Sequence, residues 1–262
     1  MLNARSSAWR YRRFSCSLQT VPGNLRWPGA GGLVSLPGLR PLVLLYHAVA
    51  DHPSNGLEIS PDMLRRQLVN VLSRGLSPVT VSEALAQRDG HVAVTFDDAS
   101  SSIRELALPV LRELGIPATA FVPPPSHRMP GLLTIDDLEA LVESGWEIGS
   151  HTCSHPFLTH EDDAALAFEL ERSRHSVEAH LDRPCRSLAY PYGDVDPRVV
   201  EATRAAGYES ACTLSAVGDA DALAWPRVAL YDIDRGWRLR LKLSSRLRRA
   251  YTAVARHPRA AT

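Results

Sequence analysis

Residues 91–98, HVAVTFDD, combine the two features that decide the fold. Residues 91–96 are mostly apolar or β-branched, a composition typical of a strand buried on both faces of a parallel sheet. Two carboxylates, Asp97 and Asp98, follow this run directly. Polar side chains that follow a parallel strand lie at its C-terminal end. In parallel (β/α) barrels, substrates are bound and converted at this end of the strands. We therefore expect a core strand that delivers both aspartates to a functional site.

Strand-like and helix-like segments alternate on both sides of this strand. Repeated strand–helix units imply a parallel sheet with helices outside it, so we predict an α/β fold, a distorted parallel (β/α) barrel of TIM-like type with about seven strands. The strands are expected at 42–46, 91–96, 118–122, 146–149 and 187–190, and the helices at 61–75, 103–114, 135–144, 163–181 and 197–206.

The chain length suits a single domain with basic ends. The 262 residues, 45% of them hydrophobic, suffice for one large core, which we place at 41–243. Residues 1–40 carry arginines without an acid and are expected to be disordered, and 244–262 form a basic tail. Such ends are commonly solvated, and weak contact with a membrane surface is the alternative. Oligomeric state is left open.

Charge and cysteine content exclude several classes of protein. Lys and Arg total 29 and so do Asp and Glu, so the chain as a whole offers no electrostatic case for a nucleic-acid partner. No apolar run resembles a secretory signal or a membrane span, which favours a cytoplasmic location. The four cysteines are scattered, which argues against a zinc ribbon or a disulfide framework.

The last ordered segment has an alternating pattern. From Trp237 to Leu243, apolar residues alternate with Arg238, Arg240 and Lys242. Alternation of this kind favours a strand or an interfacial segment over a regular helix, docked on the domain as the final element.

Three polar clusters follow predicted strands: Asp97-Asp98, His151 with His155, and the tyrosine-rich segment 190–193. Two histidines four residues apart can face one point from a single helical turn, and one carboxylate then completes the three protein ligands of a catalytic zinc site. Neighbouring aspartates point to opposite sides, so one can bind metal while the other acts as base. Taken singly, each cluster also has a purely structural interpretation, as a solvated turn or a cap.

These clusters resemble, in order, the motifs of the polysaccharide deacetylases, the NodB-homology group of carbohydrate esterases (family four). The resemblance covers 41–243 and is strongest for the branch of poly-N-acetylglucosamine deacetylases, where a Tyr-His pair opens the domain. The matching segments are LYHAV (45–49), TFDD (95–98), SHTCSHP (150–156), YPYG (190–193) and WPRV (225–228).

The resemblance implies roles for individual residues. Asp98, His151 and His155 would hold a divalent metal ion, zinc in the first place and cobalt or nickel as alternatives. Asp97 would be the general base. The backbone N–H of Tyr192 would stabilise the oxyanion. Cys153 lies between the two histidines but would point away from their shared face, as a packed thiol.

The chain departs from the family pattern in three places. Ala189 stands where many relatives carry an arginine that pairs with the base, and Arg227 is the candidate replacement, with a surface arginine as the alternative. Relatives also have a late histidine that acts as acid, for which His47 is the candidate here, with a structural histidine as the alternative. Ala99 replaces a usual glycine and would be strained if its φ is positive.

The predicted function is therefore hydrolysis of a carbon–nitrogen bond other than a peptide bond. The enzyme would remove acetyl groups from an acetylated glycan or oligosaccharide, preferably of the N-acetylglucosamine type, with Asp97 activating water. Two alternatives are hydrolysis of a small non-sugar amide and a catalytically silent barrel that binds glycan.

Overall fold

The computed structural model describes residues 41–87, 90–124, 131–214 and 221–244. The expected disordered segment 1–40, and the basic tail beyond Ser244, lie outside the described residues. Within the described ranges no helix has both the length and the apolar character needed to cross a bilayer. The cytoplasmic location stays a prediction.

The main sheet is parallel throughout and follows the order β10-β9-β8-β7-β6-β5-β1-β11, with β4 beside β5. Among the described residues it has nine strands, more than the roughly seven expected for a barrel of this type, because several are too short to leave a pattern. The strands are β1 (Leu42–Tyr46), β4 (Ser77–Val79), β5 (His91–Phe96), β6 (Ala118–Val122), β7 (Glu147–Ser150), β8 (Ser187–Ala189), β9 (Ser210–Thr213), β10 (Trp225–Pro226) and β11 (Val228–Ala229). A separate pair consists of β2 (Ala48–Val49) and β3 (Glu58–Ile59).

Arg227 lies where the sheet nearly closes on itself. β10 pairs with β9 at one edge of the sheet, and β11 pairs with β1 at the other edge. Only Arg227 separates β10 from β11 along the chain, and its backbone N–H donates to the Thr213 carbonyl at 2.9 Å. The chain therefore spans the seam between the two edges, and the predicted distorted (β/α) barrel is confirmed.

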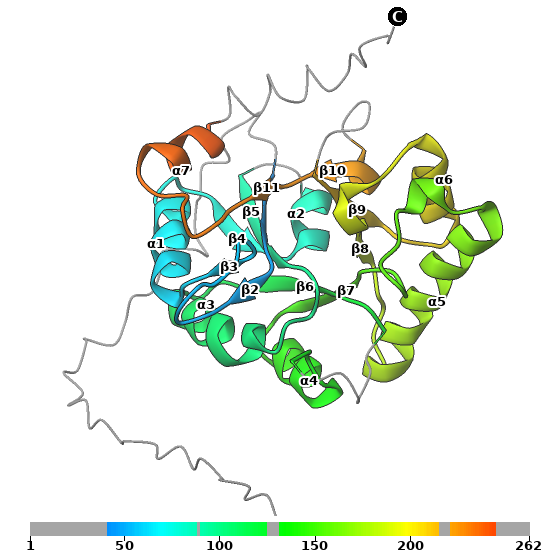
Figure 1. The fold of residues 1–262 in the computed structure, drawn as a ribbon, viewed down its shortest axis with the longest axis horizontal. Coiled ribbons are helices and arrows are strands. Elements are labelled where there is room, and N and C mark those ends of the chain that lie inside the picture. Colours follow the sequence, from blue (N-terminus) through cyan, green and yellow to red (C-terminus); the bar gives the residue numbers. More distant parts are fainter. Residues whose placement is uncertain (1–40, 88–89, 125–130, 215–220, 245–262) are drawn as a thin grey trace, which may run out of the picture. The chain divides into compact units, whose positions relative to one another are not determined.

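Helices surround the strands, and Figure 1 shows α1, α3, α4 and α5 on the outside of the sheet. Their ends follow the expected capping chemistry: the Ser60 side chain accepts from the Met63 N–H at the start of α1, and Gly115 ends α3 in the left-handed conformation. The helices are α1 (Pro61–Leu72), α2 (Val81–Gln87), a π-helix (Ile103–Ala107) that leads into α3 (Leu108–Leu114), α4 (Ile135–Glu143), α5 (Asp163–Leu181), α6 (Pro197–Ala205) and α7 (Trp237–Lys242), with short 3₁₀ turns at Leu158–His160, Pro191–Gly193 and Ala222–Ala224.

The preference for a strand or an interfacial segment over a regular helix at residues 237–243 is wrong, because Trp237–Lys242 form helix α7. Leu239 and Leu243, four residues apart, are buried, whereas Trp237 and Leu241 are exposed. One apolar pair at helical spacing thus determines the structure, and the other pair produced the misleading alternation.

Strand alternation divides the buried residues into two clusters and determines which face of the sheet Asp97 points to. Val43, Ala93 and Phe121 belong to a small cluster that excludes their immediate neighbours along the strands, and this cluster also takes in residues of α2. Successive strand residues point to opposite faces, so Thr95 and Asp97 share the face of Ala93. Asp97 is accordingly buried.

Candidate metal centre

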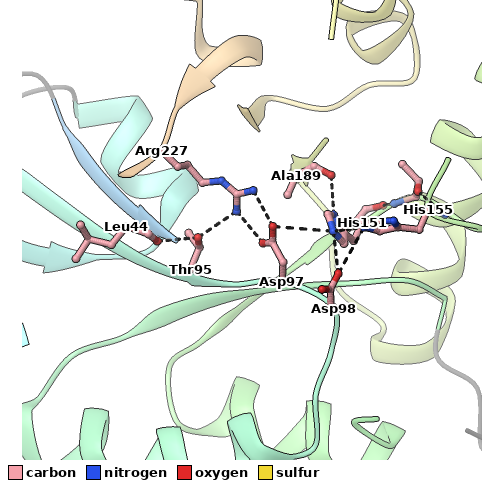
Figure 2. Close-up of polar contacts among 10 residues, drawn as sticks. Leu44, Thr95, Asp97, Asp98, His151, His155, Ala189 and Arg227 are labelled. Atoms are coloured by element: carbon pink, nitrogen blue, oxygen red, sulfur yellow. Dashed lines mark hydrogen bonds and ion pairs between the residues drawn. The ribbon is translucent and has the colours of Figure 1, made fainter. Parts of the chain in front are cut away.

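Asp98, His151 and His155 converge at the C-terminal ends of β5 and β7 (Figure 2). The Nε2 atoms of the two histidines lie 3.1 Å apart. The Asp98 Oδ1 atom is 3.4 Å from Nε2 of His151 and 3.5 Å from Nε2 of His155. Three potential ligand atoms from two distant parts of the sequence thus form a compact triangle.

The size of this triangle fits a tetrahedral divalent ion. Ligand bonds of about 2.0–2.1 Å at tetrahedral angles place donor atoms about 3.3–3.4 Å apart. The three observed separations, 3.1, 3.4 and 3.5 Å, bracket that value. Two imidazole nitrogens with one carboxylate oxygen are also a donor set that catalytic zinc uses.

Cys153 is not part of this group of potential ligands. Burial, together with the nearby Glu169 carboxylate, raises the pKa of the Cys153 thiol to about 11. A thiol that keeps its proton is a poor metal ligand, in agreement with the packed thiol expected from sequence.

The two histidines are not carried by a helical turn, which corrects the sequence-based expectation. Residues 151–157 form an irregular loop in which Thr152 and His155 have φ of 63° and 59°. Glu169 of α5 holds this loop: its carboxylate accepts from the backbone N–H groups of Cys153 and Ser154 at 2.7 and 2.9 Å. These bonds offset the strain of left-handed residues that are not glycine.

Hydrogen bonding prepares His151 to bind a metal ion. Its Nδ1 lies 2.8 Å from the carbonyl oxygen of Ala189 at the end of β8. An Nδ1–H that donates to this carbonyl leaves the lone pair of Nε2 directed at the centre of the triangle. His155 is prepared differently: burial and the neighbouring His151 lower its pKa, which favours the neutral, ligating form.

Asp97 is held by Arg227 rather than by a residue at position 189 (Figure 2). The two terminal nitrogens of Arg227 donate to the two carboxylate oxygens of Asp97, each at 2.7 Å, and one of them also donates to the Thr95 hydroxyl at 3.2 Å. Both partners are buried, so Arg227 is not a surface arginine. Burial alone would raise the pKa of Asp97, but the positive charge of Arg227 outweighs it and lowers the pKa.

The remaining candidates lie around this pair. Asp97 Oδ2 is 3.9 Å from Nε2 of His151, beside the triangle. His47 directly follows β1 and is half-buried. Burial lowers its pKa, while the charges of Asp97 and Asp98 act against that shift. Tyr192 has φ of 58° and an exposed ring that meets the ring of His155 edge to face, with centroids 4.6 Å apart. The structure thus gathers all the candidate residues at one end of the barrel.

Ala99, which replaces the glycine usual in the family, has the positive φ that was expected to strain it. Its φ is 53°, and Asp98 before it has φ of 66°. The chain is held in this turn by the carbonyl of Ala99, which accepts from the Leu133 N–H at 2.7 Å. Asp98 remains in the triangle despite the alanine.

Sequence reasoning did not identify Glu169 and Thr95 as parts of this site. Glu169 lies on the buried face of α5 with Leu166 and Leu170, and a carboxylate among buried leucines was a signal that something must neutralise it. Thr95 donates to the Leu44 carbonyl and accepts from Arg227, and nothing in a strand-interior threonine indicates that role.

Comparison with known proteins supplies the family. The profile of the family described as Polysaccharide deacetylase matches residues 85–211. A curated relative, the poly-beta-1,6-N-acetyl-D-glucosamine N-deacetylase of Staphylococcus epidermidis, is 28% identical over 155 residues, which are 52% of this chain and 53% of that protein. The chain thus spans about half the length of this relative.

Two solved structures share the fold. The deacetylase PplD of Streptococcus pyogenes superposes with a TM-score of 0.71 over 79% of this chain and 99% of that one, at 20% identity. IcaB from Ammonifex degensii gives a TM-score of 0.63 over 75% of this chain and 94% of that one, at 28% identity. Together with the ordered motifs, these matches identify a polysaccharide deacetylase domain of the NodB type at residues 85–211.

Proposed function

We propose that this protein is a metal-dependent hydrolase that removes acetyl groups from an acetylated glycan, preferably one built of N-acetylglucosamine. One observation carries the proposal: a triangle of ligand atoms of the right size for a divalent ion lies beside a buried aspartate that an arginine holds in place. The family match supports the reaction, and the names of the relatives support the substrate class.

Asp98, His151 and His155 would hold the metal ion, zinc in the first place and cobalt or nickel as alternatives. Bound there, the ion would polarise the acetyl carbonyl and lower the pKa of the attacking water toward about 7. The donor set contains no second carboxylate, which fits zinc better than magnesium or calcium.

Asp97 would take the proton from the attacking water. Its lowered pKa means that the carboxylate is ionised at neutral pH, as a base must be. The bidentate pair with Arg227 also fixes the plane of the carboxylate, so its position relative to the triangle is set before substrate binds.

The backbone N–H of Tyr192 would donate to the oxyanion that forms on the acetyl group. A preorganised donor of this kind can contribute about 3 kcal/mol to the stabilisation of the transition state. Tyr192 and Gly193 have left-handed conformations, with φ of 58° and 69°. A tight turn of this kind would let the backbone come close to the acetyl group.

His47 would return a proton to the leaving nitrogen. Because burial lowers its pKa, His47 is neutral in the resting enzyme and must first receive a proton within the site. The negative charges of Asp97 and Asp98 favour its protonated form. In this scheme the proton removed from water leaves on the amine, and acetate and a free amino sugar are the products.

Two other functions remain alternatives. Hydrolysis of a small non-sugar amide would use the same residues. A catalytically silent, glycan-binding barrel is favoured by Ala189, by Ala99 and by the missing late histidine. Arg227 supplies the cation that the usual arginine would provide, which weakens the first of these three arguments.

Acetate release from N-acetylglucosamine oligomers, measured with zinc-loaded protein, tests the proposal. We expect turnover that chelation abolishes and that Asp97→Asn abolishes while zinc stays bound. Absence of acetate from every glycan tried, with one ion bound per chain, would overturn it. Turnover of small amides alone would favour the second function, and glycan binding without turnover the third.

A further inference from the structure

Helix α7 turns one apolar pair toward the domain and a second apolar pair toward solvent. Leu239 and Leu243 are buried, whereas Trp237 is 69% exposed and Leu241 is 50% exposed. Trp237 and Leu241 are four residues apart, so they lie one above the other on the same face of the helix. The helix therefore carries an exposed apolar stripe opposite its buried one.

Contacts along α7 hold this stripe outward. Arg74, which follows α1, donates to the carbonyl of Leu243 at 3.3 Å. The Nζ atom of Lys242 donates to the Ala229 carbonyl at 2.9 Å and to the Asp234 carboxylate at 2.6 Å. Both cations thus tie the helix to the domain, and the exposed stripe is a fixed part of the folded surface.

Two further arginines flank the stripe. With about 3.6 residues per turn, Arg238 and Arg240 fall on either side of the line that joins Trp237 and Leu241. Both arginines are exposed, and the guanidinium of Arg238 lies 5.5 Å from the centroid of the Trp237 ring. Among the described residues, no carboxylate pairs with either arginine. The charge beside the stripe is therefore positive and uncompensated.

The same combination continues beyond α7. Ile233, in the segment that leads into the helix, is 61% exposed. Arg66 of α1 and Arg235 line a cleft of about 180 Å³ between α1 and α7 (Figure 1), and within the described ranges neither pairs with a carboxylate. Asp234 also lines this cleft, but Lys242 neutralises its carboxylate. We call Arg66 together with residues 233–241 the α7 surface.

We propose that the α7 surface docks the domain on a membrane that contains anionic lipids. An amphipathic helix with tryptophan on its apolar face and arginines beside it lies in the plane of the membrane, with the apolar face at the boundary between headgroups and acyl chains. Tryptophan favours this boundary because its ring is apolar and its N–H is polar. The guanidinium groups of the α7 surface would bind lipid phosphates.

A lipid surface fits better than a second copy of the chain. A stable protein interface commonly buries about 800 Å² on each partner, far more than a stripe of two apolar side chains provides. In a symmetric dimer the same patch meets itself, so the unpaired arginines of the two copies would repel each other. An anionic lipid surface instead supplies the opposite charge over a wide, flat area.

Sedimentation with lipid vesicles tests the proposal and requires neither metal nor turnover. The full chain is mixed with vesicles of pure phosphatidylcholine, or of phosphatidylcholine and phosphatidylglycerol in equal parts. We expect the wild type to bind mainly the anionic vesicles, and Trp237→Ala with Leu241→Ala to bind them about tenfold more weakly. The melting temperature should not change, because both side chains are exposed. Phe168→Ala with Leu57→Ala, which truncates two side chains exposed elsewhere, should bind like the wild type.

A second pair of variants tests the charge. Arg238→Gln with Arg240→Gln should weaken binding to the anionic vesicles about tenfold. Arg172→Gln with Arg183→Gln removes the same total charge from exposed positions on and just after α5, and should leave binding unchanged. Equal effects of the two double variants would show that net charge, and not the α7 surface, governs binding.

Three other outcomes would overturn the proposal. Absence of wild-type binding to the anionic vesicles would exclude a membrane as the partner. Binding that persists in Trp237→Ala with Leu241→Ala and disappears at high salt would assign it to the basic ends of the chain, since residues 245–262 include arginines and no acid. A dimer in light scattering that the same double variant converts to a monomer would assign the stripe to contact between two copies.

Discussion

Arg227 and Asp97, 130 residues apart in the sequence, form a buried bidentate ion pair with both N···O distances at 2.7 Å. Arg227 lies between β10 and β11, where the two edges of the sheet meet, and Asp97 follows β5. The pair therefore links the closure of the barrel to the position of the proposed base.

Arg227→Met should destabilise the fold by about 3–5 kcal/mol, because it leaves the Asp97 carboxylate buried without a partner. Urea unfolding measures this change. Arg65→Met is the control: Arg65 pairs with Glu113 at 2.6 Å on the surface, and loss of an exposed pair should cost less than about 1 kcal/mol. The double variant Asp97→Asn with Arg227→Met should recover part of the loss, since no buried charge remains. Equal effects of Arg227→Met and Arg65→Met would contradict this interpretation.

The cost of Arg227→Met should depend on pH with a defined sign. The folded-state pKa of Asp97 is lowered, so the pair stabilises the wild-type protein above the ordinary aspartate pKa of about 3.9, and this contribution is lost as pH falls through the folded value. In the variant, protonation of Asp97 removes the unpaired charge. The difference in unfolding free energy between the two proteins should therefore be largest at neutral pH and shrink in acid. A difference that grows in acid would refute the assignment.

Removal of a metal ligand should abolish both ion binding and the stabilisation that it brings. Zinc at one hundred times its dissociation constant stabilises a folded protein by about 2.7 kcal/mol. His151→Ala and His155→Ala should show no zinc-dependent rise in melting temperature and no stoichiometric zinc by elemental analysis. Cys153→Ser should behave like the wild type, although Cys153 lies between the two histidines, because its thiol keeps its proton. Loss of zinc from Cys153→Ser would mean that the ligand set is wrong.

Much of the fold was predictable where local pattern and tertiary role coincide. Strand β5 was identified because a strand buried on both faces needs a continuous apolar run, and the two aspartates marked its C-terminal end. The barrel itself was predicted, but the strands that close it were not, since β10 and β11 have two residues each and leave no periodic signal. Arg227 could be proposed as the partner of Asp97, but which face it turns to depends on this closure.

The site shows the same division. The identities of Asp98, His151 and His155 follow from residue types and spacing, and their convergence follows from parallel strand order. The conformation of the histidine loop could not be predicted in this way. Thr152 and His155 have positive φ, and neither residue type indicates that conformation as a glycine would. Its stability depends on Glu169, which comes from a helix that follows in the sequence.

Glu169 gives the last prediction. Its Oε2 accepts from the N–H groups of Cys153 and Ser154, and its Oε1 accepts from the Ser154 hydroxyl at 2.7 Å. Glu169→Leu removes both carboxylate oxygens, so the two backbone N–H groups and the Ser154 hydroxyl all lose their acceptor. Zinc affinity should fall by about 10–100-fold, as is typical when a group that orients metal ligands is changed, and zinc dissociation should accelerate. Chelator competition measures both quantities. Glu171→Leu, an exposed change on the same helix, should have no effect on either quantity, and equal zinc affinity in the two variants would show that Glu169 does not position the histidines.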